Sequence, residues 1–167
     1  MGPEKIMSMY FDTKKQQELI AAAKSWIGVN YRHLGKGRGG CDCAHFIGGI
    51  LVDIGIIDQI ESQYYSRDWY VHGTDEILLD GLQRHIERFS HGIYGKFFDY
   101  AGERLLIGDI LCMKLYSDTC PHHHAALMLD GNRIIHCLES KGVYVADFHY
   151  RWIERTFKYY RLFRKDN

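Results

Sequence analysis

The sequence has no net charge, no long apolar run and little proline. Its 21 Lys and Arg residues balance 21 Asp and Glu residues, so no overall field draws the protein to nucleic acid or to an anionic membrane. No stretch reaches the roughly 20 apolar residues of a membrane-spanning helix, and the N-terminal region lacks the basic start and apolar run of a signal peptide. These absences predict a protein that is made in the cytoplasm and has neither a nucleic-acid partner nor a membrane span.

A pair of closely spaced cysteines of the CxxC type is also missing. The five cysteines are an odd number without a disulfide-type spacing, which is typical of a reducing compartment. Cys112 and Cys137 are predicted to be small buried core residues. Cys41 is either a neighbour of a functional site or a loop residue, and a bridge between Cys41 and Cys43 would strain the disulfide geometry.

The length of 167 residues and the apolar content of 46% fit one domain with a single core. Helical periodicity comes first and strand patterns come later, which predicts an α+β fold. Residues 1–11 are predicted to be a loose leader, and residues from about 58 to 104 an insertion that covers one side of a site. Predicted helices cover about 12–27, 43–54 and 78–89, and predicted strands cover 110–115, 125–129, 133–138, 143–148 and 157–163.

Cys43 is the strongest candidate for a reactive residue. It follows a glycine-rich loop and precedes an apolar helical stripe, with Asp42 as a natural N-cap. The positive end of a helix favours the thiolate, which is the nucleophilic form. Gly48 and Gly49 inside this helix each cost about 1 kcal/mol relative to alanine, which suggests that another backbone approaches closely, as in tight packing on a sheet.

Two histidines occupy a predicted hairpin. His124 lies six residues before Asp130, and His136 lies six residues after it. In a hairpin that is symmetric about Asp130, the two would be directly opposite, with Cβ atoms about 5 Å apart. One imidazole would then act as the base for Cys43 while the other orients it.

Five segments form a recognisable pattern: residues 26–32 (WIGVNYR), 40–46 (GCDCAHF), 108–111 (GDIL), 124–131 (HAALMLDG) and 134–136 (IIH). Together they resemble the NlpC/P60 family of cysteine peptidases. The aspartate-cysteine-alanine start, the glycine-aspartate strand and the late Trp152 look most like its phage-associated branch.

The resemblance implies a papain-like α+β fold with the nucleophile at a helix N-terminus, and no cofactor or metal. It implies hydrolysis of peptidoglycan stem peptides at the γ-D-glutamyl-diaminopimelate bond. Cys43 would be the nucleophile, His124 the base and His136 the orienting residue. Tyr31 would lie near the thiol, and Asp42 would meet the free amine of the substrate.

The sequence departs from the family where Ala44-His45 follows the cysteine in place of a small residue and glycine. Two other functions stay open for this reason. One is an assembly component, for example in a phage tail, that keeps the fold with little or no activity. The other is a related thiol amidase or acyltransferase with another substrate. A virion-associated protein and one released to act on the cell wall both fit the sequence.

The tract from Cys120 to His124 is a weaker candidate for a zinc site. Adjacent histidines in an extended strand face opposite ways, so they do not converge on one ion. His122 and His123 are therefore predicted to be loop or rim residues. No role is assigned to six further histidines: His33, His45, His72, His85, His91 and His149.

Overall fold

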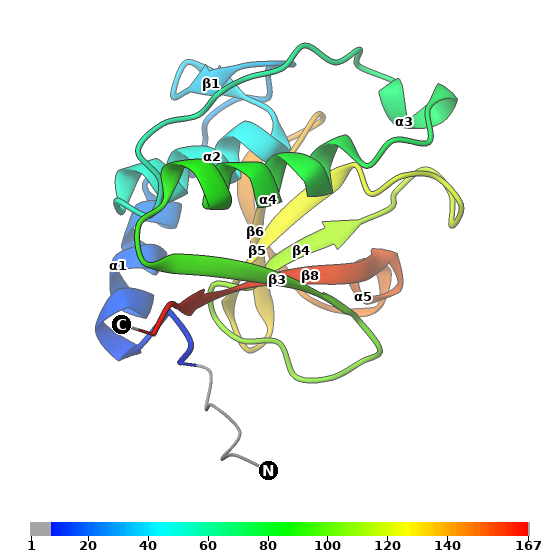
Figure 1. Ribbon diagram of the computed structural model, residues 1–167. Coiled ribbons are helices and arrows are strands. Elements are labelled where there is room, and N and C mark those ends of the chain that lie inside the picture. Colours follow the sequence, from blue (N-terminus) through cyan, green and yellow to red (C-terminus); the bar gives the residue numbers. More distant parts are fainter. Residues whose placement is uncertain (1–7, 167) are drawn as a thin grey trace.

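A computed structural model describes residues 8–166, and they form an α+β fold, as predicted (Figure 1). The helices are α1 (Thr13–Lys24), α2 (Cys43–Asp53), α3 (Trp69–His72), α4 (Ile77–Phe89) and α5 (Tyr150–Arg155). The main sheet consists of β3 (Ile93–Asp99), β4 (Ile110–Met113), β5 (His124–Asp130), β6 (Arg133–Leu138), β7 (Gly142–Asp147) and β8 (Thr156–Arg164). Two short strands, β1 (Lys36–Gly37) and β2 (Gly40–Cys41), form a separate ribbon.

The main sheet is antiparallel and has the order β3-β8-β4-β5-β6-β7. Its residues alternate between two apolar layers, as the period of two in a strand requires. Ala125 and Leu127 pack with residues of α1, α2 and α4, whereas Ala126 and Met128 pack with Trp152 of α5. Figure 1 shows α2 and α4 on the same side of the sheet. The main core therefore lies beneath these helices.

The predicted leader falls partly outside the described residues, because the structure describes the chain only from residue 8. Residues 8–11 are held against the last strand: Tyr10 N donates to Leu162 O at 3.0 Å, and Arg164 N donates to Ser8 O at 2.9 Å. Phe11 is buried. This short segment belongs to the body of the fold and is not loose.

Side chains, and not another backbone, pack against the two glycines of α2. A Cβ on Gly49 would lie 2.5 Å from the ring of Trp26, which follows α1, and a Cβ on Gly48 would lie 2.9 Å from Cδ1 of Ile60. The predicted close approach is confirmed, but the prediction that a backbone makes it was wrong. Gly49 lets Trp26 fill the space between α1 and α2.

The predicted insertion contributes to the sheet itself. Residues 58–104 include α3, α4 and β3, and β3 forms one edge of the main sheet by pairing with β8. α3, α5, β1, β2 and β3 were not predicted. The segment is therefore both a wall of the site and a part of the framework.

The hairpin of β5 and β6 has a register that differs from the prediction. His136 pairs with Ala126, and His124 pairs with Met113 of β4. Asp130 pairs with Arg133, so the turn is centred between Gly131 and Asn132 and not on Asp130. An irregularity between Met128 and Asp130 then shifts the pairing back by one residue, and the net register differs from the predicted one by two residues. His124 and His136 keep the same face because the shift is an even number of residues.

Asp109 is expected to be a structural residue of high energetic importance. Its carboxylate is 1% exposed and accepts two bonds from Arg161, with Nε at 2.8 Å and Nη2 at 2.7 Å, besides one from Leu106 N. Replacing Asp109 with alanine leaves the half-buried guanidinium without its partner and is expected to lower the free energy of unfolding by about 3 kcal/mol. Urea denaturation tests this, and an unchanged midpoint would contradict it. Asp99→Ala, which removes the exposed partner of Lys158, is the control and should cost about 0.5 kcal/mol.

Candidate active site

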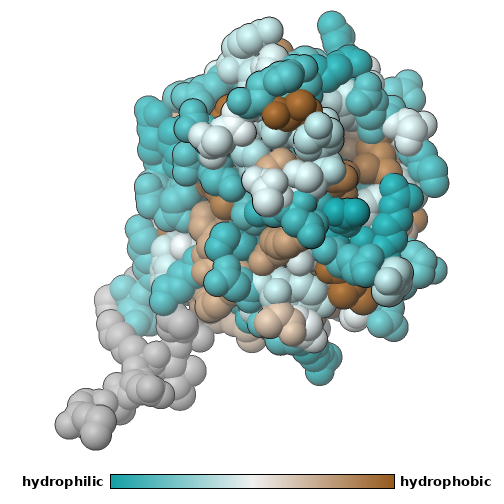
Figure 2. Space-filling model, turned by 90° about the vertical axis from the view of Figure 1, so that its right-hand side faces the viewer, coloured by the Kyte–Doolittle hydropathy of each residue, from teal (hydrophilic) through white to brown (hydrophobic). Residues whose placement is uncertain are grey.

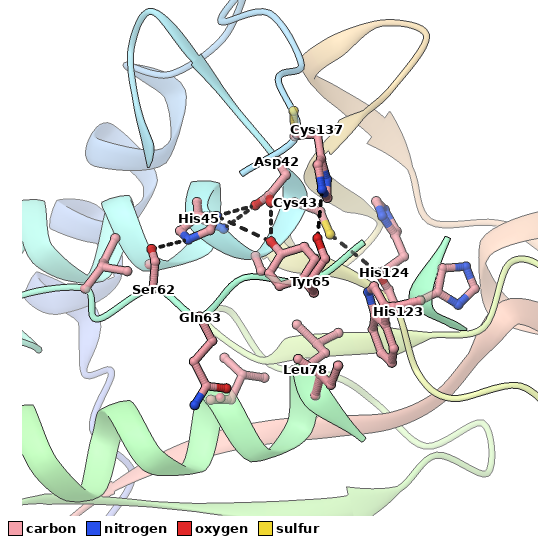
Figure 3. A pocket seen from close by; sticks show the side chains of 18 of the residues that line it. Asp42, Cys43, His45, Ser62, Gln63, Tyr65, Leu78, His123, His124 and Cys137 are labelled. Carbon is pink, nitrogen blue, oxygen red and sulfur yellow. Dashed lines mark hydrogen bonds and ion pairs between the residues drawn. The ribbon is translucent and has the colours of Figure 1, made fainter. Parts of the chain in front are cut away.

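Cys43 is the first residue of α2, directly after its N-cap. Asp42 Oδ1 accepts from His45 N at 2.9 Å, which closes the first turn of the helix. The Cys43 thiol lies 3.6 Å from the carbonyl oxygen of His123 and donates to it. In Figure 3, Asp42, His45 and Tyr65 lie on one side of Cys43, and His123 and His124 lie on the other. The predicted helix start is thus in place, and it brings the thiol to the beginning of β5.

The thiol is protonated at rest, contrary to the expectation from the helix dipole. Burial raises the pKa of Cys43 to about 12, and the negative charge of Asp42 adds to this effect. The backbone N–H groups of Cys43, Ala44 and Ala125 lower the pKa but do not outweigh burial. A base must therefore remove the thiol proton when the thiol reacts.

His124 and His136 form a buried pair. His124 Nε2 and His136 Nδ1 are 2.8 Å apart, and both rings lie near the indole of Trp152. Burial lowers the pKa of both, that of His136 to about 4 and that of His124 well below its usual value. Both rings are neutral near pH 7, and Nδ1 is the ring nitrogen of His124 that is not engaged with His136.

The two tautomeric arrangements of the His124–His136 pair differ in free energy. His136 Nε2 is buried and has no hydrogen-bond partner among residues 8–166. When His136 Nδ1–H donates to His124, this unpartnered atom is a bare acceptor. When His124 Nε2–H donates to His136, the unpartnered atom carries a proton, which is a costly state for a buried N–H. Only the second tautomer leaves His124 Nδ1 free to act as a base.

The low pKa of His136 predicts a loss of stability in acid. The unfolded chain takes up this proton near pH 6.5, whereas the folded chain takes it up only near pH 4. Between these values the unfolded state binds more protons, so the free energy of unfolding falls by roughly 3 kcal/mol as the pH drops from 6.5 to 4. Urea denaturation at several pH values should show a smaller fall in His136→Asn than in the control His149→Asn, which changes an exposed histidine. Equal falls would contradict the prediction.

Hydrogen-bond donors within the protein already occupy both carboxylate oxygens of Asp42. It is 3% exposed, and each oxygen has two donors: Oδ1 accepts from the backbone N and from Nδ1 of His45, and Oδ2 accepts from the Tyr65 hydroxyl and from Leu34 N. Burial alone would raise its pKa, but the hydrogen bonds from His45 and Tyr65 outweigh this and hold the pKa below its usual value. A substrate ammonium would have to displace one of these donors.

His45 and Tyr65 are the residues that the sequence did not reveal. His45 Nδ1 is 2.8 Å from Asp42, and its Nε2 is 2.8 Å from Ser62 Oγ. The ring therefore donates to the carboxylate and accepts from Ser62, which ties the segment after α2 to the start of α2. The only signal was the unusual histidine two residues after Cys43; nothing in the sequence pointed to Ser62 or Tyr65.

Tyr31 lies where the sequence predicted it, at the wall of the same cavity as Cys43. It pairs with Cys41 through an isolated bridge. Burial raises the pKa of its hydroxyl, and the negative charge of Asp42 adds to this. The hydroxyl is therefore protonated at neutral pH and is able to donate to a nearby oxygen.

Removing the Tyr65 hydroxyl tests whether Asp42 can serve a substrate amine. Tyr65→Phe deletes one of the four donors to Asp42 and is expected to cost about 1 kcal/mol in stability. It is also expected to raise one ratio about fivefold: kcat/KM for substrates with a free N-terminus divided by kcat/KM for their N-acetylated forms. Tyr64→Phe, at a neighbouring exposed position, is the control. An unchanged ratio in Tyr65→Phe would show that Asp42 stays closed to substrate.

His122 and His123 differ in their surroundings. His122 lies in the loop before β5, as predicted, but it is buried and not at the rim: it is 4% exposed. Its Nδ1 lies 3.1 Å from both oxygens of Glu76. His123 stacks on Tyr70 with ring centroids 3.7 Å apart and lines the cavity. Across residues 8–166, no three His, Cys, Asp or Glu side chains come together in a way that could hold a metal ion.

The other cysteines agree with the sequence. Cys112 and Cys137 are buried, as predicted, and the open question about Cys41 is resolved in favour of a buried position beside Cys137, with the two sulfurs 3.9 Å apart. Cys41 lies next to the site without lining its cavity.

A cavity of about 430 Å³ joins these groups. Tyr31, Asp42, Cys43 and His124 all contribute to its wall, whereas His136 lies behind His124. Apolar residues of α2, α4 and the segment between them form much of the rest. Figure 2 shows brown apolar patches among the hydrophilic residues of one face of the molecule. In the part of the chain that the structure describes, no helix is long and apolar enough to cross a membrane.

Solved structures of NlpC/P60 proteins share this fold. An NlpC/P60 family protein from Bacillus cereus matches 86% of this chain with a TM-score of 0.57 and 20% identity. An NLP/P60 family protein from Staphylococcus aureus, described as similar to a lipoprotein, matches 98% with a TM-score of 0.58 and 16% identity. The NlpC/p60 domain of the peptidoglycan hydrolase SagA matches 86% with a TM-score of 0.50 and 22% identity.

The fold is therefore that of NlpC/P60 domains. The chain covers 39% of the Bacillus cereus protein, 45% of the Staphylococcus aureus protein and 96% of the SagA domain. No protein-family model matches the sequence, and no curated protein is similar to it in sequence.

Proposed function

We propose that this protein is a cysteine peptidase of the NlpC/P60 type that hydrolyses peptidoglycan stem peptides, at the γ-D-glutamyl-diaminopimelate bond. One observation carries the proposal: a thiol at the start of a helix and one ring of a histidine pair line the same cavity, on the fold of NlpC/P60 domains. The name of the SagA domain, from a peptidoglycan hydrolase, supports the substrate class.

In the proposed mechanism, Cys43 attacks the amide carbon. Because the resting thiol is protonated and His124 is neutral, His124 takes the proton as the sulfur–carbon bond forms and later gives it to the leaving amine. His136 holds His124 through Nε2. The oxyanion would be met by the N–H of Cys43 at the helix start and by the Tyr31 hydroxyl.

A second candidate is a structural or assembly role with little turnover, as in a phage tail. The raised pKa of the Cys43 thiol favours it, because a protonated thiol reacts slowly without a base. Asp42 favours it too, since its carboxylate is already saturated by the chain. A measurement of stem-peptide hydrolysis separates the peptidase from the assembly component.

The test is mass spectrometry of defined muropeptides after incubation with the protein. The proposal predicts two products, one ending in γ-D-glutamate and one beginning with diaminopimelate. Cleavage at another bond would correct the substrate assignment. Intact muropeptides after long incubation at high enzyme concentration would favour the assembly role.

A further inference from the structure

The cavity beside Cys43 extends along the gap between α2 and α4. On α2 it is lined from Cys43 to Leu51, and on α4 from Ile77 to His85. Each of these stretches advances by about 12 Å along its helix axis. The cavity is thus elongated, with the thiol beside one end.

Polarity is divided along this cavity. The exposed lining residues form its rim, and apart from Tyr116 they are polar: Glu61, Ser62, Gln63, Arg67 and Glu139. The inner lining between the helices is mostly apolar and buried or half-buried: Ala44, Gly48, Leu51, Ile57, Ile60, Leu78, Gly81 and Leu82. Three polar side chains of the same helices also line it: His45 on α2, and Arg84 and His85 near the far end of the α4 stretch. The part of a ligand that lies against these apolar residues is therefore expected to be apolar itself.

Gly81 keeps the inner part open. It lies inside α4, where glycine costs about 1 kcal/mol relative to alanine, and it lines the cavity together with Ile77 and His85 one turn away on either side. A Cβ at Gly81 would have no atom within 4 Å. No close packing requires a glycine here, and its effect is to leave space. Ile60, from the segment between α2 and α4, packs closely onto Gly48 of α2.

We propose that this apolar passage binds a linear aliphatic acyl chain of about eight to twelve carbons, with its carbonyl carbon at Cys43. An elongated, mostly apolar passage suits a flexible aliphatic chain that extends along both helices. At about 30 Å³ per heavy atom, the space of a liquid water molecule, the 430 Å³ of the cavity holds on the order of 14 heavy atoms. The site is thus an acylase site for aliphatic amides or esters, an activity separate from stem-peptide cleavage that uses the same nucleophile.

The reaction rests on the Cys43 chemistry of the proposed function. The Cys43 sulfur bonds to the acyl carbon, the bond from that carbon to nitrogen or oxygen breaks, and the thiol proton leaves with the amine or alcohol. Water then cleaves the thioester, which releases the fatty acid and restores the thiol. Atoms and charge balance without an oxidant, a reductant or another co-reactant.

The first measurement is the chain-length dependence of hydrolysis. p-Nitrophenyl esters of two to twelve carbons serve as probes. Each methylene that enters the passage can raise kcat/KM up to about fourfold, so the decanoyl ester should exceed the acetyl ester at least 100-fold. A flat profile with Cys43-dependent acetyl hydrolysis would overturn the proposal while leaving the nucleophile intact.

Gly81→Leu places a side chain in the passage and should lower the ratio of decanoyl to acetyl hydrolysis at least tenfold. Asp80→Leu is the matched control, because Asp80 is an exposed neighbour outside the cavity lining, and it should keep the wild-type ratio. Gly81→Ala shows that α4 tolerates a side chain here, and it should not lower the melting temperature. An unchanged ratio in Gly81→Leu would overturn the proposal.

Binding without turnover separates this proposal from the proposed function. Calorimetry of Cys43→Ala with decanoate should show one site, and Gly81→Leu in the same background should weaken binding at least tenfold. If the protein binds decanoate but hydrolyses no ester, the assignment of Cys43 as the nucleophile is refuted, whereas the assignment of the passage as the acyl-binding site stands. Absence of decanoate binding to Cys43→Ala would refute the passage.

Discussion

Replacing Cys43 with alanine is expected to lower kcat/KM on stem peptides at least 10⁴-fold. The sulfur is the only atom at the start of α2 that can form the covalent bond in the proposed mechanism, and loss of a nucleophile typically removes nearly all of the rate enhancement. The substitution removes one atom from a residue at a helix start whose cap is made by Asp42. The fold should therefore be retained.

The control for this prediction is Cys112→Ala. Cys112 is a fully buried thiol of β4 that does not line the cavity, so its loss should leave turnover unchanged. Circular dichroism and melting temperature establish that both variants are folded. A Cys43→Ala protein with more than a tenth of the wild-type activity would refute the covalent mechanism.

Replacing His124 with alanine is expected to lower kcat by about 10³-fold, the range of a general base. The protonated thiol makes this dependence strong, because no preformed thiolate is present to react without help. His136→Asn keeps a hydrogen-bond acceptor for His124 Nε2 and should cost about tenfold. Single-turnover kinetics on the same stem peptide measure both effects at the chemical step.

His123→Gln completes this series. His123 lines the same cavity, and its carbonyl is the acceptor of the Cys43 thiol, so its ring is the natural competitor for the role of base. The account predicts less than a tenfold change in His123→Gln. A large loss in His123→Gln together with an active His124→Ala would reassign the base to His123.

Local patterns in the sequence predicted the helix at Cys43 and the five strands from β4 to β8, because each has clear periodicity or a turn. The β5–β6 register was not predictable in the same way. The turn is centred between Gly131 and Asn132 and not on Asp130, and an irregularity between Met128 and Asp130 shifts the pairing by one further residue; the turn residues alone do not reveal such a shift. Strand β3 was missed because Gly95 interrupts it; that glycine makes room for the ring of Tyr160 on the neighbouring strand.

The site, too, could be predicted from the sequence only where local patterns determine it. The sequence predicted that His124 and His136 would meet, and they do, although by a diagonal contact. The saturation of Asp42 depends on Tyr65, 23 residues away in a segment without regular structure, and no local pattern predicts such a contact. The raised pKa of Cys43 is a property of burial in the tertiary structure, whereas the helix dipole is a local property that the sequence already suggests.

The most direct test of the central claim is to identify the acyl-enzyme. The wild-type protein is mixed with L-Ala-γ-D-Glu-diaminopimelate, quenched in acid during turnover and digested for mass spectrometry. The account predicts an added L-Ala-γ-D-Glu group on the peptide that contains Cys43, and no such adduct in Cys43→Ala. An adduct on another residue, or normal product formation by Cys43→Ala, would contradict it.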